Sequence, residues 1–348
     1  MVRTESHVMN NSGITISSRR RKLHYGKIHI EKTWLYYYSI LPAFHLTVFK
    51  MVPGDPTRLM VEGQKQSVSP EQYEMLYQQA RVRLGLDKPI PVQYLSWMGN
   101  ILQGDFGYST VYRIPVKELI GPPMKNTIAL NVVYYIFLFA IGIPLGIKCA
   151  VKKDTVFDTS LQVATMIGIS IPSFISALIF IYLFAIKIPI FPISGMVTTG
   201  ANFTGFRAFL DYLYHMALPI IVCLTGIGGL IRYVRGALLD ALSMDYVRTA
   251  RAKGLKEKTV IYKHAFRNAM IPITGWIVGS IVGIFGGAVI IETLFSWKGV
   301  GKLLIDSLNQ HDYTVALSMQ MFYILLGLAA NLITDLCYCI VDPRIKLD

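Results

Sequence analysis

Long apolar runs recur along the whole chain, separated by polar and basic segments. A helix needs about 20 mostly apolar residues to cross the hydrocarbon core of a bilayer. Six runs come close to this length or exceed it, and each predicts a membrane-spanning helix. They cover approximately residues 33–49, 126–150, 160–186, 216–237, 271–294 and 315–341. The pattern therefore predicts an all-α membrane protein with about six transmembrane helices.

Composition supports this class, because 53% of the 348 residues are hydrophobic and only 16% are charged. Soluble proteins of this size carry about 25% charged residues. The four cysteines lie in or beside apolar runs without paired spacing, so we expect buried thiols rather than disulfides or a zinc site. In a membrane protein, the positions of the residues behind the net charge of +13 indicate the orientation of the spans. We therefore expect no nucleic-acid partner.

The first run is the weakest of the six, since it contains Pro42 and His45 and follows a basic cluster. A cleaved signal peptide is the competing interpretation. No small-residue cleavage site follows the run, which continues into "KMVPGDP". We therefore expect an uncleaved span.

Basic residues predict the orientation of the spans. With the amino terminus inside, the inner segments hold seven, three, nine and two Lys or Arg, which is 21 of the 34 in the chain. Positive charge accumulates in short cytoplasmic loops, so both termini are expected on the cytoplasmic side of the cell membrane. Residues 1–32 then form a basic cytoplasmic tail that could lie on anionic lipid, and residues 344–348 form a short inner tail.

Residues 33–125 are expected to comprise the first span and a long outer loop. Ser69, Pro70 and Gln72 have the spacing of a helix start, and that helix should end at Gly85. "PVQYLSWMGNILQG" predicts a second, amphipathic helix. Its apolar side fits the membrane interface and an external partner equally well.

The basic insert between the fourth and fifth spans reads "DYVRTARAKGLKEKTVIYKHAFRNAMIP", residues 245–272. Gly254 follows a helix-favouring stretch, and apolar residues alternate with basic ones after it, which predicts a short amphipathic helix beyond a glycine break. Pro272 is expected to start the next span. The insert is longer than a reconnection requires, so it is either a docking helix or a membrane-surface helix.

The insert resembles the cytoplasmic signature of permease subunits of ATP-binding-cassette importers, in the form of the oligopeptide, dipeptide and nickel branch. That form looks like "DYVRTARAKGL", which stands at residues 245–255 without a gap. Further similar stretches are "VPGDP" (52–56), "GLDKPIPVQYLSWM" (85–98), "GDFGYS" (104–109), "GISIPSF" (168–174), "ETLFSWKGVGKLL" (292–304) and "DPRI" (342–345). Lys298 departs from the proline that is usual in the outer turn, and the first 30 or so residues have no counterpart.

The resemblance implies a type I importer permease fold over residues 126–343, with a coupling helix between the fourth and fifth transmembrane helices. It implies a non-enzymatic, pore-forming subunit that imports short peptides by alternating access. Expected partners are a homologous second permease in a heterodimer, two cytoplasmic ATPases that bind ATP and Mg²⁺, an external solute-binding protein, and membrane lipid. The chain itself should hold no cofactor or metal. The residues expected to dock on the ATPase are Asp245, Tyr246, Ala250, Ala252, Lys253, Gly254, Leu255, Lys256, Val260 and His264.

Three other features are candidates for a role in the spans. Four-spaced glycines predict a close-packing or pore-lining face, and they are Gly275, Gly279, Gly283 and Gly287. Pro172 predicts a bend or hinge in the third span. Asp335 lies inside the last span at a depth similar to Arg232 and Arg235, which suggests an intramembrane ion pair or a role in permeation.

Other classes of protein would need features that the chain lacks or shares with importers. "SWKGVGKLL" has some features of a phosphate-binding loop, but Ser296 and Leu303 break the pattern and the stretch is expected outside. An intramembrane enzyme would need a nucleophile or metal set that the sequence does not contain. A proton-coupled carrier would need several buried ionisable residues. The same machinery importing nickel, opines or oligosaccharides shares all the motifs and stays open.

Overall fold

The structure is a computed structural model that describes residues 56–62, 65–83 and 85–341. Every regular element in those ranges is helical, apart from one isolated bridge between Tyr108 and Pro115. The expectation of an all-α protein is confirmed. The predicted basic tail, the first predicted span and the carboxyl-terminal tail lie outside the described residues.

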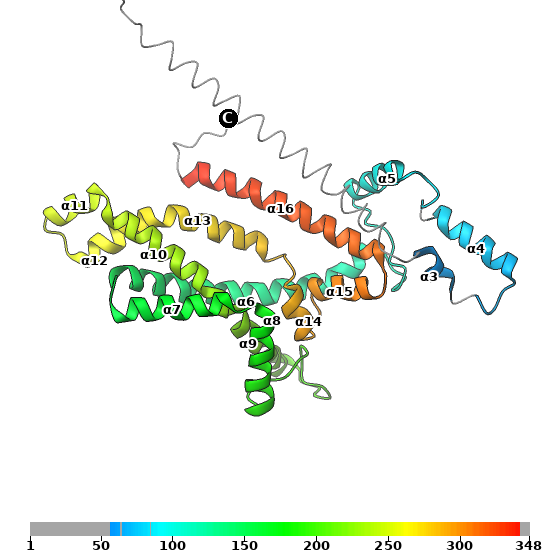
Figure 1. The fold of residues 1–348 in the computed structure, drawn as a ribbon, viewed down its shortest axis with the longest axis horizontal. Coiled ribbons are helices and arrows are strands. Elements are labelled where there is room, and N and C mark those ends of the chain that lie inside the picture. The colour runs from blue at the N-terminus through cyan, green and yellow to red at the C-terminus, as the bar shows by residue number, and fades with distance from the viewer. Residues whose placement is uncertain (1–55, 63–64, 84, 342–348) are drawn as a thin grey trace, which may run out of the picture.

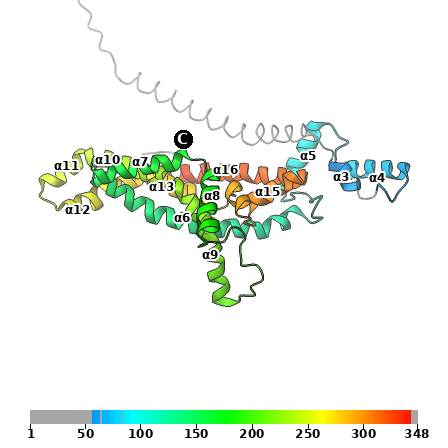
Figure 2. The same cartoon turned by 60° about the horizontal axis from the view of Figure 1, so that its bottom comes forward.

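Long helices run side by side through the molecule (Figure 1). These are α6 (Val116–Val151), α7 (Val156–Ser170), α10 (Gly228–Ser243), α13 (Phe266–Gly283) and α16 (Tyr313–Val341). One end carries α11 (Asp245–Ala252) and α12 (Glu257–Thr259). The other end carries α3 (Pro56–Glu62), α4 (Pro70–Arg83) and α5 (Ile90–Leu102), as both views show (Figure 2).

Four of the described helices are long and apolar enough to cross a membrane, and a bent pair brings the number to five if it counts as one span. The four are residues 116–151, 205–243, 257–283 and 313–334. The second of them joins α9 (Gly205–Leu224) to α10 through a 3₁₀ turn, η3 (Thr225–Ile227). The chain is therefore a multi-pass membrane protein.

Pro172 breaks the third predicted span. Helix α7 ends at Ser170, and α8 (Ser173–Ile181) starts immediately after Pro172 and continues into a π-helical turn, η2 (Tyr182–Lys187). The two halves meet at 97°. A proline has no N–H to donate and its ring crowds the preceding turn, which favours a break in the helix at this position. The predicted bend is present.

The fifth predicted span is displaced toward the amino terminus. The structure has a continuous helical stretch from Glu257 to Gly283, formed by α12, a π-helical turn η4 (Val260–Ala265) and α13. Pro272 lies inside α13 and does not start it. The reason is that Ala265, Ala269 and Ile273 continue a buried four-residue repeat across the proline. Residues 289–294 form a separate short helix, α14 (Val289–Leu294).

Glycines allow α6, α7 and α10 to pack closely. A Cβ added at Gly146 would lie 2.7 Å from Cβ of Val234, and one at Gly142 would lie 2.7 Å from Leu230. Between α7 and α10, a Cβ at Gly228 would lie 2.5 Å from Thr165. Such small residues let helix backbones approach within a membrane. The main apolar cluster forms on this framework from α6, α10, α11, η4 and α13.

Candidate functional site: the elbow at one end of the helices

The basic insert forms an elbow, residues 244–265, that turns at Gly254. Helix α11 ends with two hydrogen bonds, one from the Gly254 N–H to the Arg251 carbonyl (2.9 Å) and one from the Leu255 N–H to the Ala250 carbonyl (3.4 Å). This pair is the Schellman arrangement, which needs a left-handed residue directly after the helix. Gly254 supplies it with φ +75°. The glycine is thus required by backbone conformation, since the space around its Cβ position is open.

An ion pair connects the two arms of the elbow. The guanidinium of Arg251 in α11 donates to both carboxylate oxygens of Glu257 in α12, at 3.2 and 2.7 Å. The bidentate hydrogen bond with Glu257 raises the pKa of Arg251 further above its already high value. Both side chains are about half exposed, so the pair adds little stability. Its geometry nevertheless favours one angle between the arms.

The inner side of the elbow is fixed to the helices. Val247 and Ala250 of α11 pack with Val260 and Ala265 of the second arm in the main apolar cluster. All four are at most 5% exposed. Leu238 and Ala241 of α10 belong to the same cluster, as does Ala150 at the end of α6. Because the arms share one packed core with three long helices, a displacement of the elbow is transmitted to those helices.

The outer side of the elbow combines apolar and basic residues. Met244 and Tyr262 are 51% and 52% exposed, and Tyr246 and Leu255 are close to 40%. The same segment carries exposed basic side chains, which are Arg248, Arg251, Lys253, Lys256, Lys258 and Lys263. An exposed apolar patch with a polar rim is typical of a surface that binds another macromolecule.

The structure divides the predicted docking residues into two groups. Six of them are exposed at the outer side of the turn, and these are Asp245, Tyr246, Lys253, Gly254, Leu255 and Lys256. Ala252 is exposed beside them, His264 is half-buried, and Ala250 and Val260 face the core. The expected amphipathic helix after the glycine is not a separate element, because that segment continues into α13. The separate helix is α11, before the glycine.

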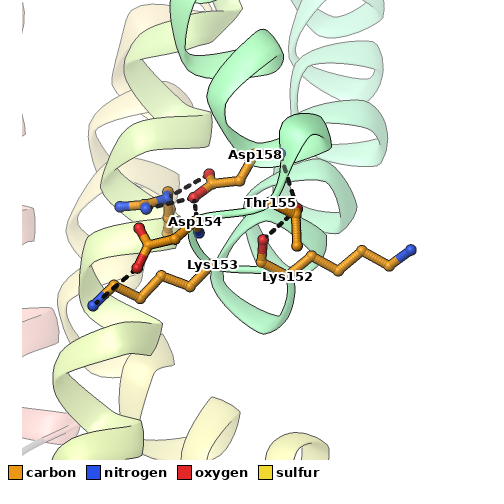
Figure 3. Close-up of polar contacts among 6 residues, drawn as sticks. Lys152, Lys153, Asp154, Thr155 and Asp158 are labelled. Atoms are coloured by element: carbon orange, nitrogen blue, oxygen red, sulfur yellow. Dashed lines mark hydrogen bonds and ion pairs between the residues drawn. The ribbon is translucent and has the colours of Figure 1, made fainter.

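One of the two arginines expected in an intramembrane ion pair, Arg235, is paired with Asp158. Arg235 of α10 donates to both oxygens of Asp158 in α7, at 2.8 and 2.6 Å. Figure 3 shows Asp158 in the first turn of α7, where it also accepts the Asp154 N–H at 3.0 Å. Arg232 is exposed and lies outside this pair. The side chain of Asp335 lies outside the described residues.

The glycine stripe does not form one helix face. Helix α13 ends at Gly283, so Gly287 lies in the turn beyond it. A Cβ at Gly283 would lie 2.3 Å from the Tyr135 hydroxyl, and one at Gly287 would lie 2.5 Å from the Gly301 nitrogen. These two positions therefore serve packing within the subunit. Gly279 is exposed with open space around it, and Gly275 is half-buried.

The stretch that has features of a phosphate loop binds a carboxylate of the same chain. Glu292, fully buried, accepts the N–H groups of Gly301 (2.7 Å) and Lys302 (3.1 Å) at the start of α15 (Val300–Asn309). Thr127 of α6 donates its hydroxyl to the same carboxylate at 2.8 Å. The helix start is thus occupied internally. In the same turn the Lys298 N–H donates to the Met196 sulfur at 3.3 Å, a contact that a proline could not make.

The fold and the elbow define a class of protein, a multi-pass membrane protein with an exposed, rigidly mounted surface at one end. The chain belongs to the family described as binding-protein-dependent transport system inner membrane component, whose profile matches residues 142–347. The profile of the amino-terminal part of such components matches residues 35–116. It is therefore a permease subunit of ABC transporters and not itself an enzyme.

Named relatives cover most of the chain. The oligopeptide transport system permease protein AppB of Bacillus subtilis is 40% identical over 301 residues, which is 86% of this chain and 92% of AppB. The dipeptide transport system permease protein DppB of Escherichia coli K12 is 37% identical over 315 residues, 85% of this chain and 91% of DppB. A putative peptide permease of Brucella suis is 38% identical over 315 residues, 89% of this chain and 96% of that protein.

Proposed function

We propose that this chain is the pore-forming permease subunit of an ATP-driven importer of short peptides. The oligopeptide and dipeptide permeases among its relatives, at 37–40% identity, support the substrate class. In this proposal the chain pairs with a homologous second permease. Two cytoplasmic ATPases, which bind ATP and Mg²⁺, and an external peptide-binding protein complete the machine. Nickel, opines, oligosaccharides and proton coupling find no support in these relatives.

The observation that carries the mechanism is the elbow, which has a packed inner side and an exposed apolar outer side. We place its outer side in a groove of an ATPase, with Tyr246, Leu255 and Tyr262 as the apolar contacts. The basic residues around them would meet an acidic rim and keep the surface soluble before assembly. This placement puts the elbow in the cytoplasm, in agreement with the nine basic residues between Arg232 and Arg267.

Alternating access then follows from the mounting of the elbow. Nucleotide binding brings the ATPases together and moves the two elbows of the permease pair. Since α11 and η4 share a core with α6, α10 and α13, these helices move as a unit. Nucleotide binding thereby shifts the equilibrium between the outward-facing and the inward-facing state of the pore. The size of the shift is set by the difference in nucleotide affinity between the two states.

The test separates docking from folding. In the reconstituted complex, Leu255→Asp should abolish peptide-stimulated ATP hydrolysis and uptake, because a carboxylate would be buried in an apolar contact. Leu102→Asp is the matched control, an exposed leucine (73%) in α5 at the opposite end of the molecule, and should leave ATPase recruitment intact. Gly254→Val forces a β-branched residue to φ +75° at a cost of about 1–2 kcal/mol, and should uncouple hydrolysis from uptake.

Gly254→Asn should retain most of the coupling, since asparagine tolerates the left-handed region. Membrane insertion of all variants is measured by protease accessibility. Normal uptake and ATPase recruitment by Leu255→Asp and Gly254→Val would refute the role of the elbow.

A further inference from the structure

Helix α10 has one face that its own subunit does not cover. Its buried residues, among them Leu230, Val234 and Leu238, point to α6 and α13. Arg235 points to α7 and is held by Asp158. Between these directions lie Gly229, Arg232, Tyr233, Gly236 and Asp240, of which Arg232, Tyr233 and Asp240 are exposed.

Arg232 lies within the apolar part of the bundle. Gly142 and Gly146 of α6 pack against Leu230 and Val234, so Arg232 is level with the α6 turn between these glycines. Residues 126–147 of α6 carry no charge, and Lys148 is the first charged residue after them. At 1.5 Å per residue, Arg232 is about one helical turn, or 6 Å, deeper than Lys148.

Among the side chains that the structure describes, which do not include that of Asp335, none forms an ion pair with this guanidinium. The carboxylate of Asp158 is 3% exposed and already takes two hydrogen bonds from Arg235. Asp240 is on the same face of α10 but eight residues, about 12 Å, closer to the elbow. A charged side chain at this depth faces a protein partner or a water-filled path, because hydrocarbon disfavours it strongly.

The surface around Arg232 has the properties of a path wall. Tyr233 and Trp276 of α13 form a ring pair with centroids 5.9 Å apart, and each is nearly 40% exposed. The Tyr233 hydroxyl donates to the Pro272 carbonyl at 3.3 Å, which fixes the ring. Gly236 and Gly279 both have open space at the Cβ position, in contrast to the tightly packed Gly146 and Gly228. Open glycines and fixed aromatic rings present a smooth surface beside a single cation.

We propose that this face of α10 lines the inner half of the translocation path, and that Arg232 binds the carboxylate of the transported peptide. The proposal rests on the proposed function, since it takes the substrate to be a peptide with a free carboxyl terminus. Arginine suits this task because its planar fork matches a carboxylate and stays charged. Tyr233 and Trp276 would contact the peptide's backbone and side chains without selecting a sequence.

The experiment measures the charge preference of the site directly. Gly236→Cys places a thiol one turn from Arg232 on the open face, in a chain whose four native cysteines are alanine and whose peptide uptake is verified. The complete complex in proteoliposomes is treated with an anionic and a cationic methanethiosulfonate of similar size. We expect the anionic reagent to react roughly tenfold faster relative to the cationic one than it does after Arg232→Gln, because a cation in a narrow path concentrates anions.

Two further variants make the result specific. Arg232→Lys should keep most of the preference. Lys148→Gln removes one positive charge from α6 at about the level of Gly236, and should leave the preference unchanged. Lys148 lies over the Phe157 ring at 4.4 Å. A saturating concentration of peptide, added with its binding protein, should slow the modification of Gly236→Cys. Arg232→Gln should lower the maximal rate of peptide uptake, while the affinity of the binding protein for peptide stays unaltered.

Each contrary outcome has a definite meaning. Reaction with a membrane-soluble maleimide only would place the face against lipid, and no reaction with any reagent would place it under the second permease. Either result overturns the inference. If wild type takes up peptide and Arg232→Gln does so equally fast, the inference fails and the proposed function stands. If the wild-type complex takes up no peptide, both fail.

Discussion

The ion pair between Asp158 and Arg235 allows a matched test, because an exposed aspartate lies four residues away. Asp158→Asn and Asp154→Asn each remove one carboxylate charge with almost no change of shape. Asp158 has a side chain only 3% exposed and holds Arg235 through two hydrogen bonds. Asp154 is 77% exposed and lies 3.8 Å from Lys153 (Figure 3).

The expected magnitudes differ severalfold. Removal of one partner from a buried ion pair leaves the other charge stranded and costs about 3–5 kcal/mol. Arg235 keeps 22% of its side chain exposed, so we expect the low end, about 3 kcal/mol, for Asp158→Asn. An exposed pair contributes about 0–1 kcal/mol, which sets the expectation for Asp154→Asn. Asparagine also tolerates the positive φ of 61° at position 154.

The assay is the free energy of unfolding of the purified permease in mixed micelles, titrated with sodium dodecyl sulfate and followed by circular dichroism. A double-mutant cycle with Arg235→Gln isolates the pair, and the double variant should lose less than the sum of the two single variants. A coupling free energy near zero, or equal losses for Asp158→Asn and Asp154→Asn, would refute the view that this pair joins α7 to α10.

Two further predictions concern packing and helix capping. Gly146→Ala should destabilise the permease in the same titration because its methyl group would overlap Val234. Gly327→Ala, at an open position of α16, should be neutral or stabilising by about 0.5–1 kcal/mol. Equal effects would contradict the close α6–α10 contact. Glu292→Ala should lower the free energy of unfolding by about 1–3 kcal/mol, because it leaves the Gly301 N–H without its buried acceptor. Glu292→Gln should lower it less. An unchanged free energy of unfolding for Glu292→Ala would contradict the capping role.

Periodicity and charge predicted much of the molecule from sequence. The all-α architecture, the position of the bend at Pro172 and the turn at Gly254 all follow from local rules, since proline and glycine act through backbone conformation. The residue at which a membrane-spanning helix begins is not determined by local sequence rules alone. Hydropathy alone started the fifth span at residue 271, although the buried repeat of Ala265, Ala269 and Ile273 begins earlier.

The contacts between side chains of different helices could not be predicted from the sequence. From the sequence, Asp335 was the carboxylate expected to pair with Arg232 or Arg235, because all three lie near the ends of their spans. The actual partner of Arg235, Asp158, precedes it by 77 residues and follows a turn whose direction is not encoded locally. The spacing of Gly142 and Gly146 was a readable signal for close packing that the more regular stripe at 275–287 obscured.

The break at Pro172 has a consequence for assembly. A backbone carbonyl one turn before a proline loses its usual intrahelical donor, and here that carbonyl belongs to Gly168. Lipid tails offer no substitute donor, so an interrupted helix at membrane depth is tolerated only beside water or another polypeptide. Residues 169–175 around the break are exposed on the isolated subunit. The corner of the bent pair is therefore a place where the finished transporter must supply either solvent or a neighbouring chain.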